Sequence, residues 1–426
     1  MSNSYAVHKI KLKPGSRIHA AQSCLYSNQI EPISAQLLGE ERCAFAITDS
    51  YEPGVYARDH LLAVRFLPKS WAKKISQLQI NADELETLLR EHLVLLQDRK
   101  TRLLRNKQEA FRWVHGDADG IPGIVVDNYG SLVVIQSGSP TGDFLLPALI
   151  RALSSVTDKA IFERSSGQIR TLEKLPERTR WIRETSQSQK VDLIETKLSG
   201  LSLSFRPQRC QKTGLFLDQR ENLLLLQEIL ANTNAKNMLD LCSYAGAWSC
   251  AAATQGVQEF TAVDQDKDAL ELCEKNIRKN GTSAAKIELL HGDLFEALAK
   301  LNKDSKKFDV VVADPPAFTK SAKHIPEAKR AYQRLTKLAS RTVNVNGIYV
   351  ACSCSRHISE EDFYEIVSSA LETDDWVYLG RGRQSPDHTV LAADKHSLYL
   401  KSLVFVRRAM LSQFSNTGKH KAASID

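Results

Sequence analysis

From about residue 191 onward, the chain alternates between short apolar runs and segments with helical periodicity. Strands are predicted at Asn237–Leu241, Glu259–Val263, Lys286–Leu290, Phe308–Ala313 and Gly347–Cys352. Helices are predicted between or after them, notably at Asp266–Lys279 and at Glu360–Leu371, where Ser359 can serve as the N-cap. Buried apolar strands that alternate with helices are typical of a parallel, doubly wound sheet. We therefore expect an α/β domain in this half of the chain.

Two further blocks precede this domain. Residues 1–70 hold short apolar or alternating runs separated by Gly and Pro, a pattern that favours a small, mostly β module. Residues 71–190 contain a helical pattern at Ala82–Gln97, with Asn81 as its cap, and then mixed strands and turns. The predicted domains are therefore 1–70, 71–190 and 191–411. Polar residues at Thr185–Gln189 form the expected link, and 412–426 the expected flexible tail.

The overall composition is that of a globular protein without a membrane span. Hydrophobic residues make up 42% and charged residues 25% of the 426, and no apolar run approaches the length that crosses a bilayer. The first residues lack the basic and apolar regions of a signal peptide, so the expected location is the cytoplasm. The eight cysteines include no Cys-x-x-Cys and no zinc-like spacing, so we expect free thiols and no metal.

The positive charge of the chain is unevenly distributed. The net charge is +7, and residues 151–220 alone hold fourteen Lys or Arg against eight Asp or Glu, a local balance of +6. A basic stretch ahead of a catalytic domain favours a polyanionic partner, because Lys and Arg neutralise phosphates. The alternative is an ordinary solvated surface, which stays open at this point.

Carboxylates lie at the ends of three successive predicted strands of the C-terminal domain. Asp240 begins a tight loop that ends at Gly246, Asp264 ends the next strand, and Asp293 follows the third. In such sheets, ligands bind outside the carboxyl ends of the strands, where a carboxylate can hold two ribose hydroxyls. The chain has no Gly-x-Gly-x-x-Gly, which disfavours NAD and FAD but is compatible with S-adenosylmethionine. The alternative is that all three aspartates merely cap strand ends.

Two motifs end the later strands. The segment Asp314–Phe318, Asp-Pro-Pro-Ala-Phe, looks like a loop with which a methyltransferase grips a planar base, and Cys354 follows the neighbouring strand. Methylation of a pyrimidine ring carbon requires such a pair, a carboxylate on the base and a thiol that adds to the ring. We assign Cys352 to packing, while Cys354 is the candidate nucleophile or, alternatively, an inert buried thiol.

These motifs occur in a recognisable order. They are Gln211–Arg220, Asp240–Gly246, Asp264, Asp293, Asp314–Phe318, Ser353–Ser355 and Ser397–Lys401. The succession resembles the bacterial large-subunit ribosomal RNA cytosine-C5 methyltransferase I family. The resemblance implies an N-terminal PUA-like RNA-binding module, a small central α/β domain and a C-terminal Rossmann-like methyltransferase. It also implies S-adenosylmethionine as cofactor and 23S ribosomal RNA as partner.

The resemblance also implies roles for individual residues. The expected cofactor-binding residues are Gln219, Arg220, Asp240, Tyr244, Gly246, Asp264, Asp293 and Asp314. The expected catalytic residues are Cys354 and Asp314, and the expected base contacts are Pro315, Pro316 and Phe318. From residue type alone, Trp248 and Tyr244 are more often core residues than cofactor contacts, although Tyr244 sits in the loop. Ala317 stands where many other RNA cytosine-C5 methyltransferases carry a second cysteine, so one thiol must suffice.

Two other functions stay open on the sequence. One is methylation of an exocyclic amine such as guanine N2, where similar Asp-Pro-Pro-aromatic loops occur and no thiol is needed. The other is a non-catalytic RNA-binding assembly factor that retains the fold. A homodimer also stays open.

Overall fold

The computed structural model describes residues 4–412, except for residues 20–21, 35–37, 40, 78, 105–108, 186–191, 320 and 395–396. Most of the predicted link Thr185–Gln189 and nearly all of the predicted tail therefore lie outside the described residues. The chain divides into two compact units. Unit 1 comprises Met1–Ile194, Arg206–Gly214 and Pro386–Ser397, and unit 2 comprises Glu195–Phe205, Leu215–Ser385 and Leu398–Asp426. The three predicted domains, with their bounds, stay a prediction.

Unit 1 begins with a sheet that has six strands in the described part of the chain. In spatial order they are β2 (Cys24–Tyr26), β5 (Leu62–Phe66), β4 (Pro53–Ala57), β3 (Cys43–Thr48), β1 (Ser4–Ile10) and β6 (Gln79–Asn81). Because β6 pairs with β1, this sheet extends beyond residue 70. Helix α3 (Ala82–Leu103) then begins with a capping box, in which Asn81 and Glu84 each accept from the other's backbone N–H. The predicted cap is confirmed.

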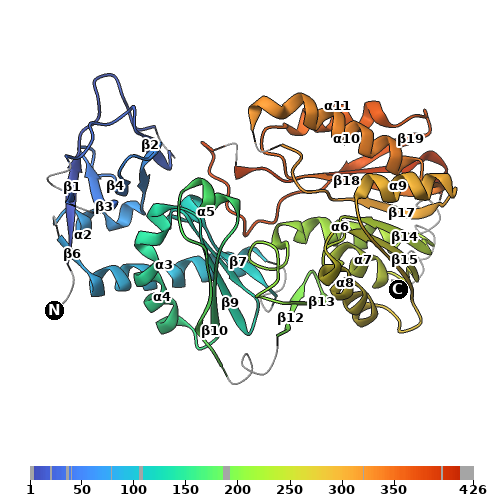
Figure 1. Cartoon of the computed structure of the whole chain (residues 1–426), viewed down its shortest axis with the longest axis horizontal. Helices are drawn as coiled ribbons and strands as arrows, with labels where there is room; N and C mark the ends of the chain where they lie inside the picture. The colour runs from blue at the N-terminus through green and yellow to red at the C-terminus, as the bar shows by residue number, and fades with distance from the viewer. Residues whose placement is uncertain are drawn as a thin grey trace, which may run out of the picture. The chain divides into compact units, whose positions relative to one another are not determined.

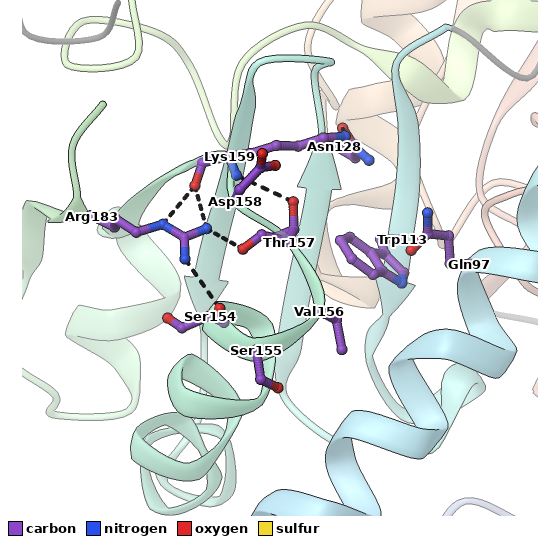
Figure 2. Close-up of a pocket in the computed structure, with 10 residues that line it drawn as sticks. All are labelled: Gln97, Trp113, Asn128, Ser154, Ser155, Val156, Thr157, Asp158, Lys159 and Arg183. Carbon is purple, nitrogen blue, oxygen red and sulfur yellow. Dashed lines mark hydrogen bonds between the residues drawn. The ribbon is translucent and has the colours of Figure 1, made fainter. Parts of the chain in front are cut away.

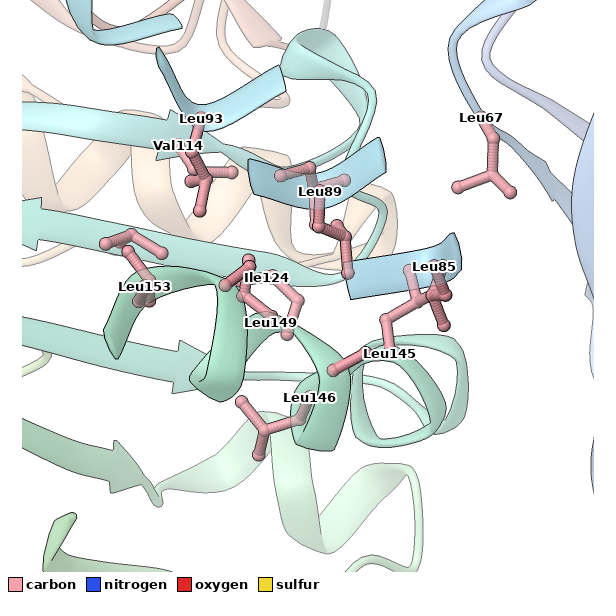
Figure 3. Close-up of a cluster of buried hydrophobic side chains, with 14 of the residues drawn as sticks. Leu67, Leu85, Leu89, Leu93, Val114, Ile124, Leu145, Leu146, Leu149 and Leu153 are labelled. Atoms are coloured by element: carbon pink, nitrogen blue, oxygen red, sulfur yellow. The ribbon is translucent and has the colours of Figure 1, made fainter. Parts of the chain in front are cut away.

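The second sheet of unit 1 has five described strands. Their spatial order is β11 (Arg178–Arg183), β10 (Ala160–Ser165), β9 (Leu132–Ser137), β8 (Ile124–Asn128) and β7 (Phe111–His115). Helices α3 and α4 (Pro140–Val156) pack against it. Leucines spaced four residues apart, such as Leu85 and Leu89 of α3 and Leu145 and Leu149 of α4, fill the space between helices and sheet (Figure 3). This leucine-rich core also includes residues of the first sheet, which joins the two sheets into one unit.

Unit 2 is built on a sheet of seven strands, counted over the described residues. Their spatial order is β16 (Lys286–His291), β15 (Glu259–Asp264), β14 (Asn237–Leu241), β17 (Phe308–Ala313), β18 (Val343–Ser353), β20 (Lys401–Arg407) and β19 (Trp376–Arg381). The five predicted strands are β14 to β18, and they pair in parallel as expected. Strand β20 pairs antiparallel with β18, so the sheet is mixed rather than purely parallel.

Helices cover both faces of this sheet, as the alternation predicts. Helices α9 (Leu294–Lys303), α10 (Ile325–Ser340) and α11 (Glu360–Ala370) lie on one face (Figure 1). Helices α6 (Arg220–Leu230), α7 (Ala247–Ala253) and α8 (Lys267–Asn280) lie on the other. The predicted N-cap of α11 is confirmed, because the Ser359 side chain accepts from the backbone N–H of Asp362.

The strand order fixes where a ligand can bind. The chain first builds β14, β15 and β16 in one direction, and then returns to the other side of β14 with β17 and β18. The carboxyl ends of these parallel strands meet at one edge of the sheet, and the order reverses between β14 and β17. Ligands of open α/β sheets bind at such a switch point.

Candidate active site

The loop after β14 is tightly constrained. Cys242, Tyr244 and Gly246 all have positive φ, at 61°, 47° and 79°. A Cβ at position 246 would lie 2.5 Å from Sγ of Cys273 on α8, so only glycine fits there. Positive φ in Cys242 and Tyr244 costs on the order of 1 kcal/mol each, and such strain is typical of ligand-binding loops.

Asp264, the last residue of β15, is held by this loop. Its Oδ2 accepts from the backbone N–H of Tyr244 at 2.8 Å, and its Oδ1 accepts from that of Asp266 at 2.9 Å. The side chain is half-buried. Each carboxylate oxygen has a second lone pair, so a fixed carboxylate of this kind fits the two adjacent hydroxyls of a ribose.

Asp240 is also part of the loop region but is fully buried. Its Oδ2 accepts from the Ser249 backbone N–H at 3.2 Å and from its hydroxyl at 2.7 Å, which ties β14 to the start of α7. Its Oδ1 has no hydrogen-bond partner among the described residues. Burial raises the pKa of Asp240 to about 7, against the opposing effect of Ser249. In this structure Asp240 positions the loop, and its contact with a cofactor stays a prediction.

Asp293 lies half-buried after β16 and caps α9. Its Oδ1 accepts from the backbone N–H groups of Phe295 at 2.8 Å and Glu296 at 3.2 Å. This geometry is what the alternative interpretation expects, in which Asp293 serves only as a cap. A capping carboxylate at a strand end can also face a ligand, so its role toward the cofactor stays a prediction.

Asp314 directly follows β17 and is held by two N–H donors from elsewhere in unit 2. Its Oδ2 accepts from Gln219 Nε2 at 2.8 Å and from Trp248 Nε1 at 3.0 Å. Gln219 is fixed in turn by Asn222, whose Nδ2 donates to Gln219 Oε1 at 2.6 Å. Gln219 and the adjacent Arg220 are both buried. The structure thus brings Gln219 to the Asp314 motif, although the two are far apart in the sequence.

Trp248 is a site contact that the sequence analysis missed. It is buried, as expected of a core residue, but its indole N–H also donates to Asp314. A buried tryptophan needs a hydrogen-bond acceptor, so one residue can serve both the core and the site.

The remaining residues of the Asp314 motif differ in how exposed they are. Pro315 is buried, Pro316 is exposed and Phe318 is half-buried. The Phe318 ring packs on Tyr332 of α10 at 4.6 Å between centroids and stacks with Phe295 at 6.4 Å. The motif is therefore a supported loop with one exposed proline and one partly exposed aromatic ring.

Tyr332 holds the Ser353–Ser355 motif through the residues directly before and after Cys354. Ser353 Oγ donates to the Tyr332 hydroxyl at 2.9 Å, and Ser355 Oγ lies 3.0 Å from the same hydroxyl. Burial raises the pKa of Tyr332 to about 12, so the hydroxyl stays protonated at neutral pH. Cys354 itself is half-buried. One buried side chain of α10 thus supports both Phe318 and the residues that flank the thiol.

Lys401, the first residue of β20, also contacts this segment. Its Nζ donates to the backbone carbonyls of Ser355 and Tyr399, both at 2.8 Å, and its side chain is buried. Burial lowers the pKa of Lys401 to about 8, whereas attraction to Cys354 acts in the opposite direction. The sequence motif that ends at Lys401 was recognised, but its proximity to Cys354 was not.

Two other cysteines near these motifs have unfavourable surroundings for a thiolate. Cys352 is buried within β18, with Sγ 3.5 Å from Ser402 Oγ, as expected of a packing residue. Cys242 is half-buried, but burial and the carboxylates of Asp264 and Asp314 raise its pKa well above that of an ordinary thiol.

The fold is an α/β sheet of the kind that binds a nucleoside-containing cofactor at its strand ends. The chain belongs to the family of S-adenosylmethionine-dependent methyltransferases, whose model matches residues 128–406. This membership confirms the predicted cofactor and the predicted Rossmann-like methyltransferase fold.

Individual relatives give more detail. The chain is 31% identical to "Ribosomal RNA large subunit methyltransferase I" of Klebsiella pneumoniae, over 70% of this chain and 74% of that protein. It is 34% identical to a putative ribosomal RNA large subunit methyltransferase of Methanocaldococcus jannaschii, over 70% of this chain and 75% of that protein. The crystal structure of a putative methyltransferase complexed with SAH superposes with a TM-score of 0.70 at 18% identity, covering 94% of this chain and 100% of that one. The last likeness concerns the fold alone.

The described residues contain neither a group of three or more His, Cys, Asp or Glu arranged to hold a metal ion nor a helix fit to cross a membrane.

Unit 1 contains a separate hollow of 620 Å³ that no motif residue lines (Figure 2). Its two cations are already engaged. Arg183 donates to carbonyl oxygens at the end of α4, including that of Ser154, and Lys159 Nζ donates to Asn128 Oδ1 at 3.0 Å. The hollow is therefore a weak candidate for an anion site.

The geometry of Asp264 leads to a prediction for cofactor binding. Asp264→Ala should weaken S-adenosylmethionine binding by about 1.5–3 kcal/mol, the usual value of a hydrogen bond to a charged group. Isothermal titration calorimetry measures the change.

Asp266→Ala is a matched control, because it removes the nearby carboxylate that caps α8 through Ala269. The control should lower stability by about 1 kcal/mol and leave affinity unchanged. Unchanged affinity in folded Asp264→Ala would exclude the ribose role.

Proposed function

We propose that this protein methylates C5 of a cytosine in large-subunit (23S) ribosomal RNA through a covalent adduct with Cys354. The observation that carries the proposal is the pairing of the two motifs. Asp314 and Cys354 follow β17 and β18, which are adjacent parallel strands, and the buried Lys401 donates to the carbonyl of Ser355, the residue after Cys354. The names of the Klebsiella and Methanocaldococcus relatives support ribosomal RNA as the substrate.

The proposed reaction begins with the Cys354 thiolate. Cytosine C5 is a weak nucleophile, and addition of the Cys354 thiolate to C6 forms an S–C6 bond that turns C5 into an enamine-like carbon. S-adenosylmethionine, when bound, supplies the electrophilic methyl group. Transfer of the C5 proton to solvent water then re-forms the C5–C6 double bond and expels the thiolate. Cys354 ends the cycle unchanged.

Asp314 is proposed to hold the N3/N4 edge of the cytosine. Its carboxylate is already oriented by Gln219 and Trp248, so little reorganisation is needed when the base arrives. Pro316 is exposed and Phe318 half-buried, which suits them to contact the ring. A target within a duplex would have to flip out of the stack.

RNA contact is proposed for the PUA-like module at residues 1–70 and the central domain at 71–190. Part of the positive charge of residues 151–220 is paired with carboxylates inside unit 1. Arg178 and Arg180 pair with Glu163 at 2.6 and 2.8 Å, and Arg170 pairs with Asp143 at 2.6 Å. These three arginines therefore stabilise unit 1 itself.

Methyl transfer to isolated ribosomal RNA tests the proposal directly. Ribosomal RNA from a strain that lacks the gene, incubated with the protein and S-adenosylmethionine, should gain 5-methylcytidine in the 23S fraction, as measured by nucleoside mass spectrometry. Gain of N2-methylguanosine would instead establish the exocyclic amine reaction, which the Asp314 motif could support without a thiol. No methyl gain on naked RNA or on assembled subunits would favour the non-catalytic assembly factor.

The role of Tyr332 gives a further prediction. Tyr332→Phe removes the hydroxyl that joins Ser353 and Ser355, so unfolding free energy should fall by about 1–3 kcal/mol. Turnover should fall on the order of tenfold to 100-fold, because small misplacement of a reacting group is costly. Chemical unfolding and single-turnover rates measure the two effects.

Tyr349→Phe is the matched control for this variant. Tyr349 is also fully buried, but its hydroxyl donates to Thr336 at 3.4 Å and touches neither motif. This control should lose some stability and retain its rate. Equal rates in the two variants would show that Tyr332 acts only on stability.

A further inference from the structure

We infer that Lys401 is the positive counter-charge that holds Cys354 as a reactive thiolate. The inference rests on the proposed function and names a positioning residue for it. Lys401 acts on Cys354 and not on the RNA base or the cofactor.

The geometry places the ammonium group beside the segment that carries the thiol. Lys401 begins β20 and pairs with Ser353, the last residue of β18, directly before Cys354. Its Nζ donates to the carbonyl of Ser355, directly after Cys354, and to that of Tyr399. The lysine thus spans the nucleophile segment from one flank to the other.

The hydrogen bonds of Lys401 leave its charge uncompensated. Both acceptors are neutral carbonyl oxygens, and Lys401 as a residue is only 6% exposed. A buried cation is expensive unless an opposite charge lies nearby. A thiolate at Cys354 provides that charge, and the stabilisation is reciprocal.

The other ionisable groups around the pair do not replace this partner. Tyr332 of α10 stays neutral because burial raises its pKa, and the same holds for the buried thiol of Cys352. Glu360 of α11 also attracts Lys401, but less strongly than Cys354, and it is ion-paired with Arg381 of β19. Arg356 lies over the Tyr399 ring, 5.7 Å from its centroid, and adds a second positive charge to the same region.

The proton balance of the step is simple. The Sγ–H bond of Cys354 breaks, its electron pair stays on sulfur and the proton goes to solvent water. Lys401 neither takes up nor gives away a proton in this step. No oxidant, reductant or further reactant is required.

The test is the pH profile of Cys354 alkylation by iodoacetamide, read by mass spectrometry of the Cys354 peptide in the full-length protein. In the wild type, the pH at which the alkylation rate is half-maximal should lie below 8.5, the approximate pKa of an ordinary thiol. A wild-type midpoint at or above that value would overturn the inference without any variant. Cys24, a half-buried thiol of unit 1, is the internal reference in the same digest.

Two substitutions separate charge from hydrogen bonding. Lys401→Gln retains an N–H donor but loses the charge, so the Cys354 midpoint should rise by about one to three pH units and the rate at pH 7 should fall about tenfold or more. Lys401→Arg retains the charge and should keep the midpoint near that of the wild type. An unchanged profile in folded Lys401→Gln would show that Lys401 is only a support for the two carbonyls.

The outcome is distinguishable from failure of the proposed function. Suppose that ribosomal RNA gains N2-methylguanosine, while the midpoint pH of Cys354 alkylation lies below 8.5 and rises in Lys401→Gln. The cytosine proposal then fails and the ion pair stands. If 5-methylcytidine forms but the pH profile of alkylation is the same in the wild type and in Lys401→Gln, only the role of Lys401 fails.

Discussion

Cys354→Ala should abolish methyl transfer, with a loss of at least about 10³-fold, because removal of a catalytic nucleophile eliminates the covalent route. The wild type should form a covalent adduct with RNA that carries 5-fluorocytosine at the target. Fluorine cannot leave C5 as a cation, so elimination stalls after methyl transfer and the thioether persists. Cys354→Ala should form no adduct and should bind S-adenosylmethionine as tightly as the wild type, as measured by calorimetry.

Cys352→Ala is the natural control, because this thiol lies two residues away but is buried in β18 against Ser402. It should retain substantial turnover and the full adduct yield. Wild-type turnover in Cys354→Ala would eliminate the covalent mechanism and favour methylation of an exocyclic amine, which needs the Asp314 motif alone.

Asp314→Asn should lower turnover by roughly 10²–10⁴-fold at saturating S-adenosylmethionine, the range over which a positioned acid or base contributes. The asparagine Oδ1 can still accept from Gln219 and Trp248, so the loop keeps its shape and only the charge is lost. Single-turnover rates measure the effect, and thermal unfolding verifies that the variant is folded.

Trp248→Phe provides a graded comparison, since it removes one of the two donors to Asp314 and leaves the carboxylate in place. Its loss of rate should be smaller, about tenfold. A wild-type rate in Asp314→Asn would show that the carboxylate does not act on the base.

The regular elements of unit 2 were predictable because their signals are local. The apolar runs at β14, β15 and β17 match the predicted strands to within a residue, since a buried strand needs consecutive apolar side chains. The caps Asn81 and Ser359 were likewise predictable, because a cap acts on N–H groups two or three residues away.

The contacts of the candidate site were less predictable, because they join residues that are far apart in the chain. Nothing in the local pattern of α10 distinguishes Tyr332 from an ordinary core aromatic. Trp248 was assigned to the core for the same reason. Lys401 precedes an apolar run and looks like a solvated strand end until β20 is placed against β18.

The sequence alone therefore determined the class of the C-terminal domain, its five parallel strands and the two motifs that carry the proposed chemistry. Only the tertiary structure decided what surrounds those motifs. The strand order puts β17 between β14 and β18, which brings Gln219 and Trp248 to Asp314. The antiparallel addition of β20 brings Lys401 to the Cys354 segment. Periodicity reports how deeply a residue is buried, whereas the partner it meets there depends on how distant segments pair.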